Sequence, residues 1–258
     1  GMSIAYGSIG LAYFYQKNYS KALEFSMKHL MLSEKRGDLW EMAKMCNNIA
    51  QIYNSRNVYD SALVFHRKSL ALHRQISLAT GEADACFNIA STLLHLGARD
   101  SAYWYSKKAV EIAQTKGIAV PPSYYVTLGN VEQSLGKYRM ATDNALTAYS
   151  LAREREMPLV LSDASLLLSD IYRKTCREDL AYRYLREHMQ LKDSISNDEF
   201  LKQVTRMEIQ YDFDKKQKAA EFEQMQEKLV RDQKIKQQRL YLKGLGILLI
   251  LVALISLL

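Results

Sequence analysis

Apolar and small residues recur along residues 4–195 in a pattern that repeats about every 40 residues. Ile49–Tyr53 matches Ile89–Leu93, and Tyr59–Phe65 matches Arg99–Tyr105, both at an offset of 40. Ile49 and Tyr53 lie four positions apart, as do Ile89 and Leu93, which places each pair on one face of an α-helix. Two such helical segments in each unit predict an array of stacked helix pairs.

Each unit has one small residue in its first predicted helix and an alanine twelve positions later in its second. Side-chain size at such contacts sets the distance between packed helices, so small residues allow two helices to approach closely. Flanking large residues, such as Ile49 and Tyr53, are expected to fill the space between neighbouring units. The small residues are Gly10, Ala50, Ala90, Gly129 and Ser169, followed by Ala22, Ala62, Ala102, Ala141 and Ala181.

This arrangement resembles the tetratricopeptide repeat family in a form longer than its minimal repeat of about 34 residues. The resemblance is carried by the small residue, a following tyrosine, a turn, and a tyrosine three positions before the alanine, as in Tyr19, Tyr59 and Tyr138. Arg99 and Glu178 replace that last tyrosine, and Glu132 replaces a first-helix tyrosine. The resemblance implies an all-α, right-handed α-α superhelical solenoid of about five helix pairs over residues 1–198.

The resemblance also implies a concave face lined by the first helix of each pair. Polar side chains in a row on this face can hydrogen-bond an extended peptide, so we expect a protein or peptide partner. A solvated face without a ligand, binding along an edge, and dimerisation remain open alternatives. The family's clamp for a terminal carboxylate is not expected, because its first-repeat positions hold Gly7 and Leu11. The predicted groove residues are Lys44, Asn47, Gln51, Asn54, Asp84, Ser91, His95, Ser123, Asn130, Gln133, Asp163, Asp170 and Arg173.

Motifs for catalysis, cofactors or metal binding are missing from the sequence. The five histidines form no His-x-x-x-His pair, and no Gly-rich phosphate loop or nucleophile elbow is present. Cys46, Cys86 and Cys176 form no CxxC motif, and we expect all three to be small buried hydrophobes. The sequence therefore predicts a protein that is not an enzyme and that has no cofactor or metal site.

Residues 199–243 predict a long charged helix, because residues 159–243 contain neither proline nor glycine. Phe200, Val204, Met207 and Tyr211 lie at helical spacing and are expected to cap the last repeat. Apolar residues become sparse beyond Tyr211, so both a weak parallel homodimer and a solvated helical spacer fit this pattern.

The last 15 residues, 244–258, carry no charge. A membrane-spanning helix needs about 20 apolar residues, so we expect the start of a transmembrane segment. A short tail anchor and a buried helix are the alternatives. Residues 228–243 contain six basic residues and one acidic residue, or +5 of the total net charge of +7. Beside an apolar run, such a segment favours anionic lipid over nucleic acid.

The order of repeats, charged helix and apolar segment resembles a group of bacterial signalling proteins, which end in a histidine kinase or helix-turn-helix output domain. This resemblance implies the sensory part of a single-pass protein of the bacterial inner membrane, without nucleic-acid binding by these residues. It places the repeats in the periplasm, whereas the basic flank favours the cytoplasmic side. A membrane-tethered scaffold and a cytoplasmic peptide-responsive regulator are the alternatives.

Overall fold

The computed structural model describes residues 2–195, together with residues 225, 228, 231, 233–236 and 238. Residues 2–195 are helices joined by short turns, and no strand occurs among them. A further helical stretch covers residues 178–195. The preceding helices are α1 (Met2–Tyr15), α2 (Tyr19–Arg36), α3 (Leu39–Ser55), α4 (Tyr59–Gln75), α5 (Ala79–His95), α6 (Arg99–Thr115), α7 (Pro122–Ser134), α8 (Tyr138–Glu154) and α9 (Pro158–Lys174).

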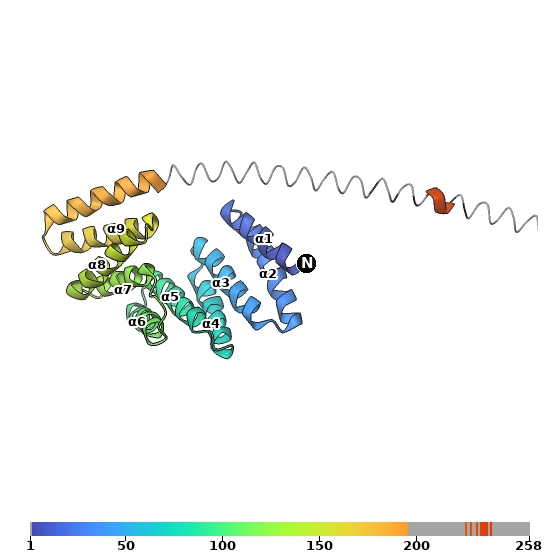
Figure 1. Ribbon diagram of the computed structural model, residues 1–258, viewed down its shortest axis with the longest axis horizontal. Coiled ribbons are helices and arrows are strands. Elements are labelled where there is room, and N and C mark those ends of the chain that lie inside the picture. Colours follow the sequence, from blue (N-terminus) through green and yellow to red (C-terminus); the bar gives the residue numbers. More distant parts are fainter. Residues whose placement is uncertain are drawn as a thin grey trace, which may run out of the picture. The chain divides into compact units, whose positions relative to one another are not determined.

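Consecutive helices pack as pairs, and each pair packs on the next (Figure 1). The first helices α5, α7 and α9 also contact one another in sequence. A stack whose first helices contact one another in this way curves toward those helices. The first helices therefore line the inner side of the curve, which we call the concave face. The structure therefore confirms an all-helical solenoid of consecutive helix pairs over residues 2–195.

Small residues occupy the contacts within the pairs, as the sequence predicted. Ala50 and Ala62 are fully buried, and so are Ala90 and Ala102 of the next pair. A Cβ atom added to Gly129 would lie 2.9 Å from Leu167 Cδ2 and 3.3 Å from the carbonyl oxygen of Ala141. Larger side chains at these positions would force the helices apart.

Each of the helices α1 to α9 is followed by a residue with positive φ. A backbone N–H then donates back to a carbonyl five residues earlier, as Val58 N does to Tyr53 O at 2.9 Å and Ala98 N to Leu93 O at 3.0 Å. This is the Schellman motif, which satisfies the last carbonyls of a helix and reverses the chain. The residues with positive φ are Lys17, Gly37, Asn57, Ser77, Gly97, Gly117, Gly136, Glu156 and Cys176.

Cys176 departs from the prediction that every cysteine is buried. Cys46 and Cys86 are fully buried, as expected, and burial raises the pKa of each thiol to about 11. Cys176 is exposed and has a φ of 57° in the turn after α9. It takes the turn position that glycine holds at Gly97 and Gly136, so the turn sets its location and hydrophobicity does not.

Aromatic rings of the two helices stack inside several pairs. Tyr53 and Phe65 have centroids 5.7 Å apart. The fourth pair holds Glu132 and Asn144 at these positions, and Asn144 Nδ2 donates to Glu132 Oε2 at 2.7 Å. Burial raises the pKa of the Glu132 carboxyl, and the hydrogen bond from Asn144 opposes this shift. A polar pair thus replaces a ring stack without leaving the carboxyl unpartnered.

Residues 196–258 form a second unit. The predicted cap at Phe200, Val204, Met207 and Tyr211 lies outside the described residues, as do most of the predicted helix over residues 199–243 and all of the apolar run 244–258. Within the residues that the structure describes, no helix combines the length and apolar character needed to cross a bilayer.

The left-handed turn at Cys176 leads to a stability prediction. A side chain with a Cβ atom costs about 1 kcal/mol in this conformation, whereas glycine adopts it freely. Cys176→Gly is therefore expected to raise the free energy of unfolding by up to about 1 kcal/mol, measured by urea unfolding and circular dichroism. Cys176→Ala keeps the Cβ atom and should leave stability unchanged. A lower stability of the glycine variant would contradict this account of the turn.

Candidate functional site

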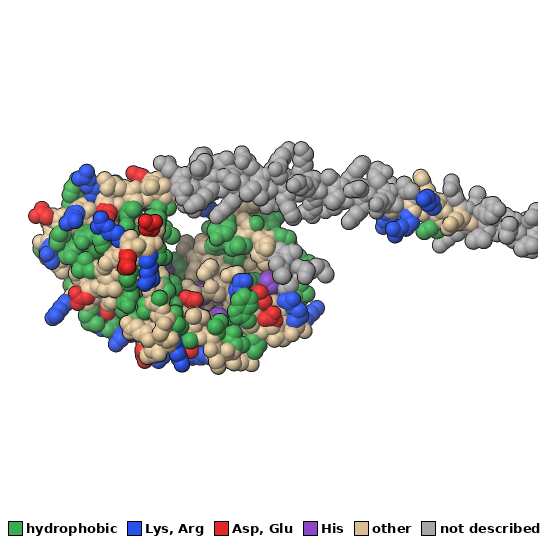
Figure 2. Space-filling view, in the orientation of Figure 1, with side chains coloured by type: hydrophobic (Ala, Val, Ile, Leu, Met, Phe, Trp, Pro, Cys, Tyr) green, Lys and Arg blue, Asp and Glu red, His purple; other side chains and the backbone are tan. Residues whose placement is uncertain are grey.

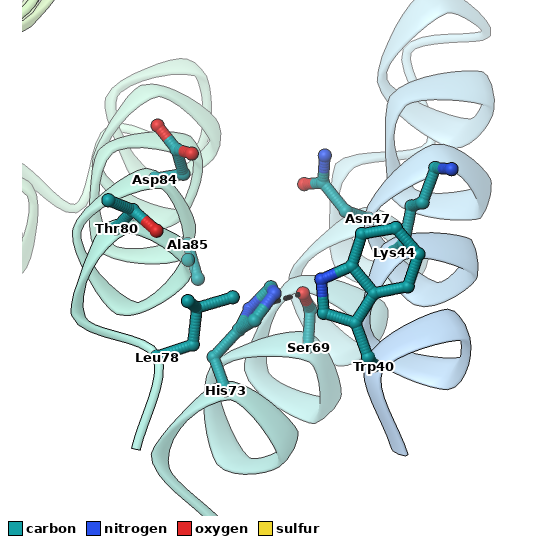
Figure 3. Close-up of a pocket in the computed structure, with 10 residues that line it drawn as sticks. Trp40, Lys44, Asn47, Ser69, His73, Leu78, Thr80, Asp84 and Ala85 are labelled. Atoms are coloured by element: carbon teal, nitrogen blue, oxygen red, sulfur yellow. Dashed lines mark hydrogen bonds between the residues drawn. The ribbon is translucent and has the colours of Figure 1, made fainter. Parts of the chain in front are cut away.

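Among the described residues, two hollows are lined by residues of the first helices of neighbouring pairs. The first, the α3–α5 hollow, has a volume of about 230 Å³ and lies between α3, α4 and α5 (Figure 3). Three predicted groove residues line it: Lys44, Asn47 and Asp84. Figure 3 shows Lys44 and Asn47 across the hollow from Asp84, with side chains of α4 at its base.

Contacts within the protein hold the walls of the α3–α5 hollow. The Lys44 ammonium lies 4.9 Å from the ring centroid of Trp40, a cation–π contact, and Trp40 is 50% exposed. Asn47 Oδ1 accepts a hydrogen bond from Asn88 Nδ2 at 2.9 Å. Asp84 Oδ1 accepts one from the Tyr124 hydroxyl at 2.6 Å. The wall residues are therefore positioned before any ligand arrives.

His73 forms the base of this hollow. Its ring packs against Gly81, where an added Cβ atom would clash with His73 Cδ2. Ser69 Oγ donates to the Ala43 carbonyl at 2.9 Å and lies 3.4 Å from His73 Nδ1. Burial lowers the pKa of His73, and the nearby Asp84 carboxylate opposes the shift. The base is therefore an uncharged imidazole at neutral pH.

Sequence reasoning missed several residues of this hollow, namely Trp40, Ser69, His73 and Thr80. Trp40 and Thr80 share one repeat position, four residues before Lys44 and Asp84. That spacing places them on the same helix face, and it could have identified them. His73 carries no comparable signal, because its position depends on the absence of a side chain at Gly81.

The second hollow, the α5–α9 hollow, has a volume of about 340 Å³ and lies between α5, α7 and α9. The predicted residues Ser91, Asn130 and Asp170 occupy the same position in three successive repeats, and all three line it. Ser123 and Asp163 share another repeat position and line it as well. The apolar part of its lining consists of Phe87, Val126, Val160, Leu166 and Leu167.

The other predicted groove residues line neither hollow. Gln51 is exposed on α3, and Gln133 is half-buried on α7 with its Nε2 buried and unpartnered among the described residues. The His95 ring stacks on Tyr59 with a centroid distance of 4.9 Å. Arg173 donates to Asp170 Oδ1 at 2.7 Å. A role for these residues in ligand binding stays a prediction.

Asn54 also lines neither hollow, and it connects three helices. Its Nδ2 donates to Thr92 Oγ1 on α5 at 3.1 Å and lies 3.3 Å from His66 Nε2 on α4. The amide of Asn54 is thus used inside the protein, although the sequence predicted it in the groove.

Within the described part of the chain, no group of three or more histidine, cysteine, aspartate or glutamate residues is arranged to hold a metal ion. Figure 2 shows basic and acidic side chains interspersed over the visible face of residues 2–195, without a large patch of one sign.

Comparisons with known proteins agree with this architecture. Family models described as tetratricopeptide repeat match residues 42–77 and 83–116, which contain most of α3–α4 and α5–α6. The structure of BtubC from P. vanneervenii is 19% identical, with a TM-score of 0.61 and coverage of 72% of this chain and 78% of that one. No curated protein matches the sequence at a significant level.

Two Rap proteins are also similar in structure. A Rap protein complexed with Competence and Sporulation Factor is 22% identical, with a TM-score of 0.65 and coverage of 75% of this chain and 54% of that one. The Rap conjugation gene regulator of plasmid pLS20, in complex with the Phr* peptide, is 20% identical, with a TM-score of 0.64 and coverage of 74% and 53%. The chain thus spans about half the length of each of these two Rap proteins. Two segments of this chain therefore match tetratricopeptide repeat models, and the solenoid has the fold of these solved structures.

The buried His66 predicts a loss of stability in acid. Burial lowers its pKa from 6.5 to about 4, so the unfolded chain binds the extra proton between these values. The free energy of unfolding should fall by about 1.4 kcal/mol for each pH unit below 6.5, or about 3 kcal/mol in total. Urea titrations across this range measure the slope.

The control for this pH dependence is His66→Ser, because serine occupies the equivalent positions Ser26 and Ser106. This variant should show a shallower slope below pH 6.5, whatever its absolute stability. Equal slopes in the two proteins would show that His66 is not the group responsible.

Proposed function

We propose that residues 2–195 bind an extended peptide, or an extended segment of a protein, along the concave face. The observation that carries this proposal is the α5–α9 hollow, where equivalent positions of three repeats converge on one space of about 340 Å³. Convergence of successive repeats on one surface suits a ligand that runs across them. The peptide held by the similar Rap regulator supports this reading.

The chemistry of this hollow suits a peptide backbone. An extended peptide presents N–H and C=O groups that need partners when water is removed. The hydroxyl groups of Ser91 and Thr127 and the amide of Asn130 can both donate and accept hydrogen bonds. The adjacent Val126 and Leu166 offer apolar surface to the ligand's side chains. Polar groups therefore set the ligand's register, and apolar contact adds affinity.

We further propose that this module is the sensory part of a membrane-anchored bacterial signalling or transcription-regulating protein. The order of elements in the sequence supports this proposal: the repeats are followed by the charged residues 199–243 and the uncharged residues 244–258. Ligand binding would change dimerisation or helix rotation in residues 199–243, with the repeats in the periplasm and a single pass through the inner membrane. A membrane-tethered scaffold without signalling output is the alternative, and neither version assigns catalysis to this chain.

Peptide binding to the groove can be tested by filling the α5–α9 hollow. The chain would be used to select binders from a random short-peptide display library, and their affinity would be measured by fluorescence polarisation. Ser91→Tyr places a bulky neutral side chain in the hollow and should weaken binding by at least about tenfold. Ser150→Tyr, on the exposed side of α8, is the matched control. Failure to select any binder, or equal affinities of the two variants, would contradict the proposal.

Membrane anchoring can be tested by fractionation of a bacterial host that expresses the chain. Residues 1–258 should remain in the membrane pellet after alkaline carbonate extraction, whereas a chain ending at residue 243 should move to the supernatant. Leu251→Arg should also weaken retention, because an arginine at the centre of a bilayer costs about 2.5–3.5 kcal/mol. Release of the intact chain by carbonate would contradict the anchor.

A further inference from the structure

We infer that the α5–α9 hollow selects a peptide carrying a lysine or arginine side chain, whose cationic group pairs with the Asp163 carboxylate. This inference rests on the proposed peptide-binding function and adds the chemistry of the ligand. It follows from four features of the described residues. These are the charge of the hollow, the lack of a described partner for Asp163, the electrostatic environment of its carboxylate, and the apolar surface beside it.

The first feature is the charge of the lining. Asp163 and Asp170 are both among the residues that line the hollow, and no lysine, arginine or histidine is among them. Asp170 is neutralised in part by Arg173, which donates to its Oδ1 at 2.7 Å. An anionic side chain entering this hollow would be repelled, whereas a cationic one would be attracted.

The second feature is that Asp163 has no hydrogen-bond or ion-pair partner among the described residues. Asp84 occupies the same repeat position two pairs earlier, and its carboxylate accepts a hydrogen bond from Tyr124. Asp170 has Arg173. Within residues 2–195 Asp163 is thus the groove aspartate whose carboxylate is left available to a ligand.

The third feature is the electrostatic environment of that carboxylate, which is less favourable to its charge than open solvent is. Asp163 is exposed on the groove, yet burial among the neighbouring helices raises the pKa of its carboxyl, and the His188 ring opposes the shift. The His188 ring is itself engaged, because its Nδ1 lies 2.9 Å from Ser162 Oγ. A carboxylate in such an environment gains more from a cationic partner than one in open solvent does.

The fourth feature is the apolar surface that accompanies the aspartates. Phe87, Val126 and Val160 share the lining with Asp163. Lysine and arginine have long aliphatic stems that pack on apolar surface while the charged head reaches a polar partner. The volume of about 340 Å³ lies at the low end of ligand pockets, about 300–1,000 Å³, and so suits individual side chains of an extended chain.

The experiment is a double-mutant cycle on the full chain. The probe is the tightest peptide selected by the wild-type chain from the random library, with each arginine replaced in turn by citrulline and each lysine by norleucine. One such replacement should weaken binding to the wild-type chain by about tenfold. Asp163→Asn should weaken binding of the parent peptide to a similar extent. The two changes combined should weaken binding little more than either change alone, because both remove the same interaction.

The matched control is Asp143→Asn, which makes the same change at an exposed position of α8. It should bind the parent peptide as the wild-type chain does. Unfolding midpoints of both variants verify that the fold is retained.

The outcomes separate the two proposals. Selected peptides that lose affinity with Ser91→Tyr but contain no basic residue, or that bind Asp163→Asn unchanged, would overturn the cationic ligand and leave the groove function standing. If no peptide can be selected, the groove function fails and the cationic ligand fails with it. A coupling between Asp163 and one basic residue of the peptide would support both.

Discussion

The close approach of paired helices at small residues is the constraint on which the rest of the structure depends. Ala50 and Ala62 are fully buried between α3 and α4. A Cβ atom added to Gly129 would press against the side chain of Leu167 and the backbone carbonyl of Ala141. This spacing lets every pair pack on the next in the same way. The inner faces of the first helices then meet, and the hollows between them are consequences of that repeated geometry.

The same geometry divides the polar residues of the first helices into two groups. Asn54 and Asn47 hydrogen-bond to Thr92 and Asn88 across neighbouring repeats, so their amides stabilise the stack. Asp163 faces the α5–α9 hollow without such a partner within the described residues. The difference matters for function, because a polar group already paired inside the protein has less to offer a ligand. Exposure alone does not identify the binding residues of such a face.

The fourth helix pair shows how far the repeat tolerates a change in chemistry. Where the second pair stacks Tyr53 on Phe65, the fourth places Glu132 against Asn144 with a hydrogen bond of 2.7 Å. Both arrangements fill the space between the same two positions, so the distance between the two helices of the pair is retained. Glu132 marked a departure from the family pattern in the sequence, but its partner twelve residues later became evident only from the packed pair.

The sequence by itself determined the helical class, the period and the pairing of helices over residues 2–195, because these depend on local spacing and on residue size at regular positions. It also located Ser91, Asn130, Asp163 and Asp170 on the first-helix face of their repeats. Only the tertiary structure decided which of the predicted residues share a hollow and which are bound elsewhere. Asn54 meets Thr92 and Asp84 meets Tyr124 at separations of 38 and 40 residues. Such contacts depend on the rotation of one repeat on the next, which no local pattern specifies.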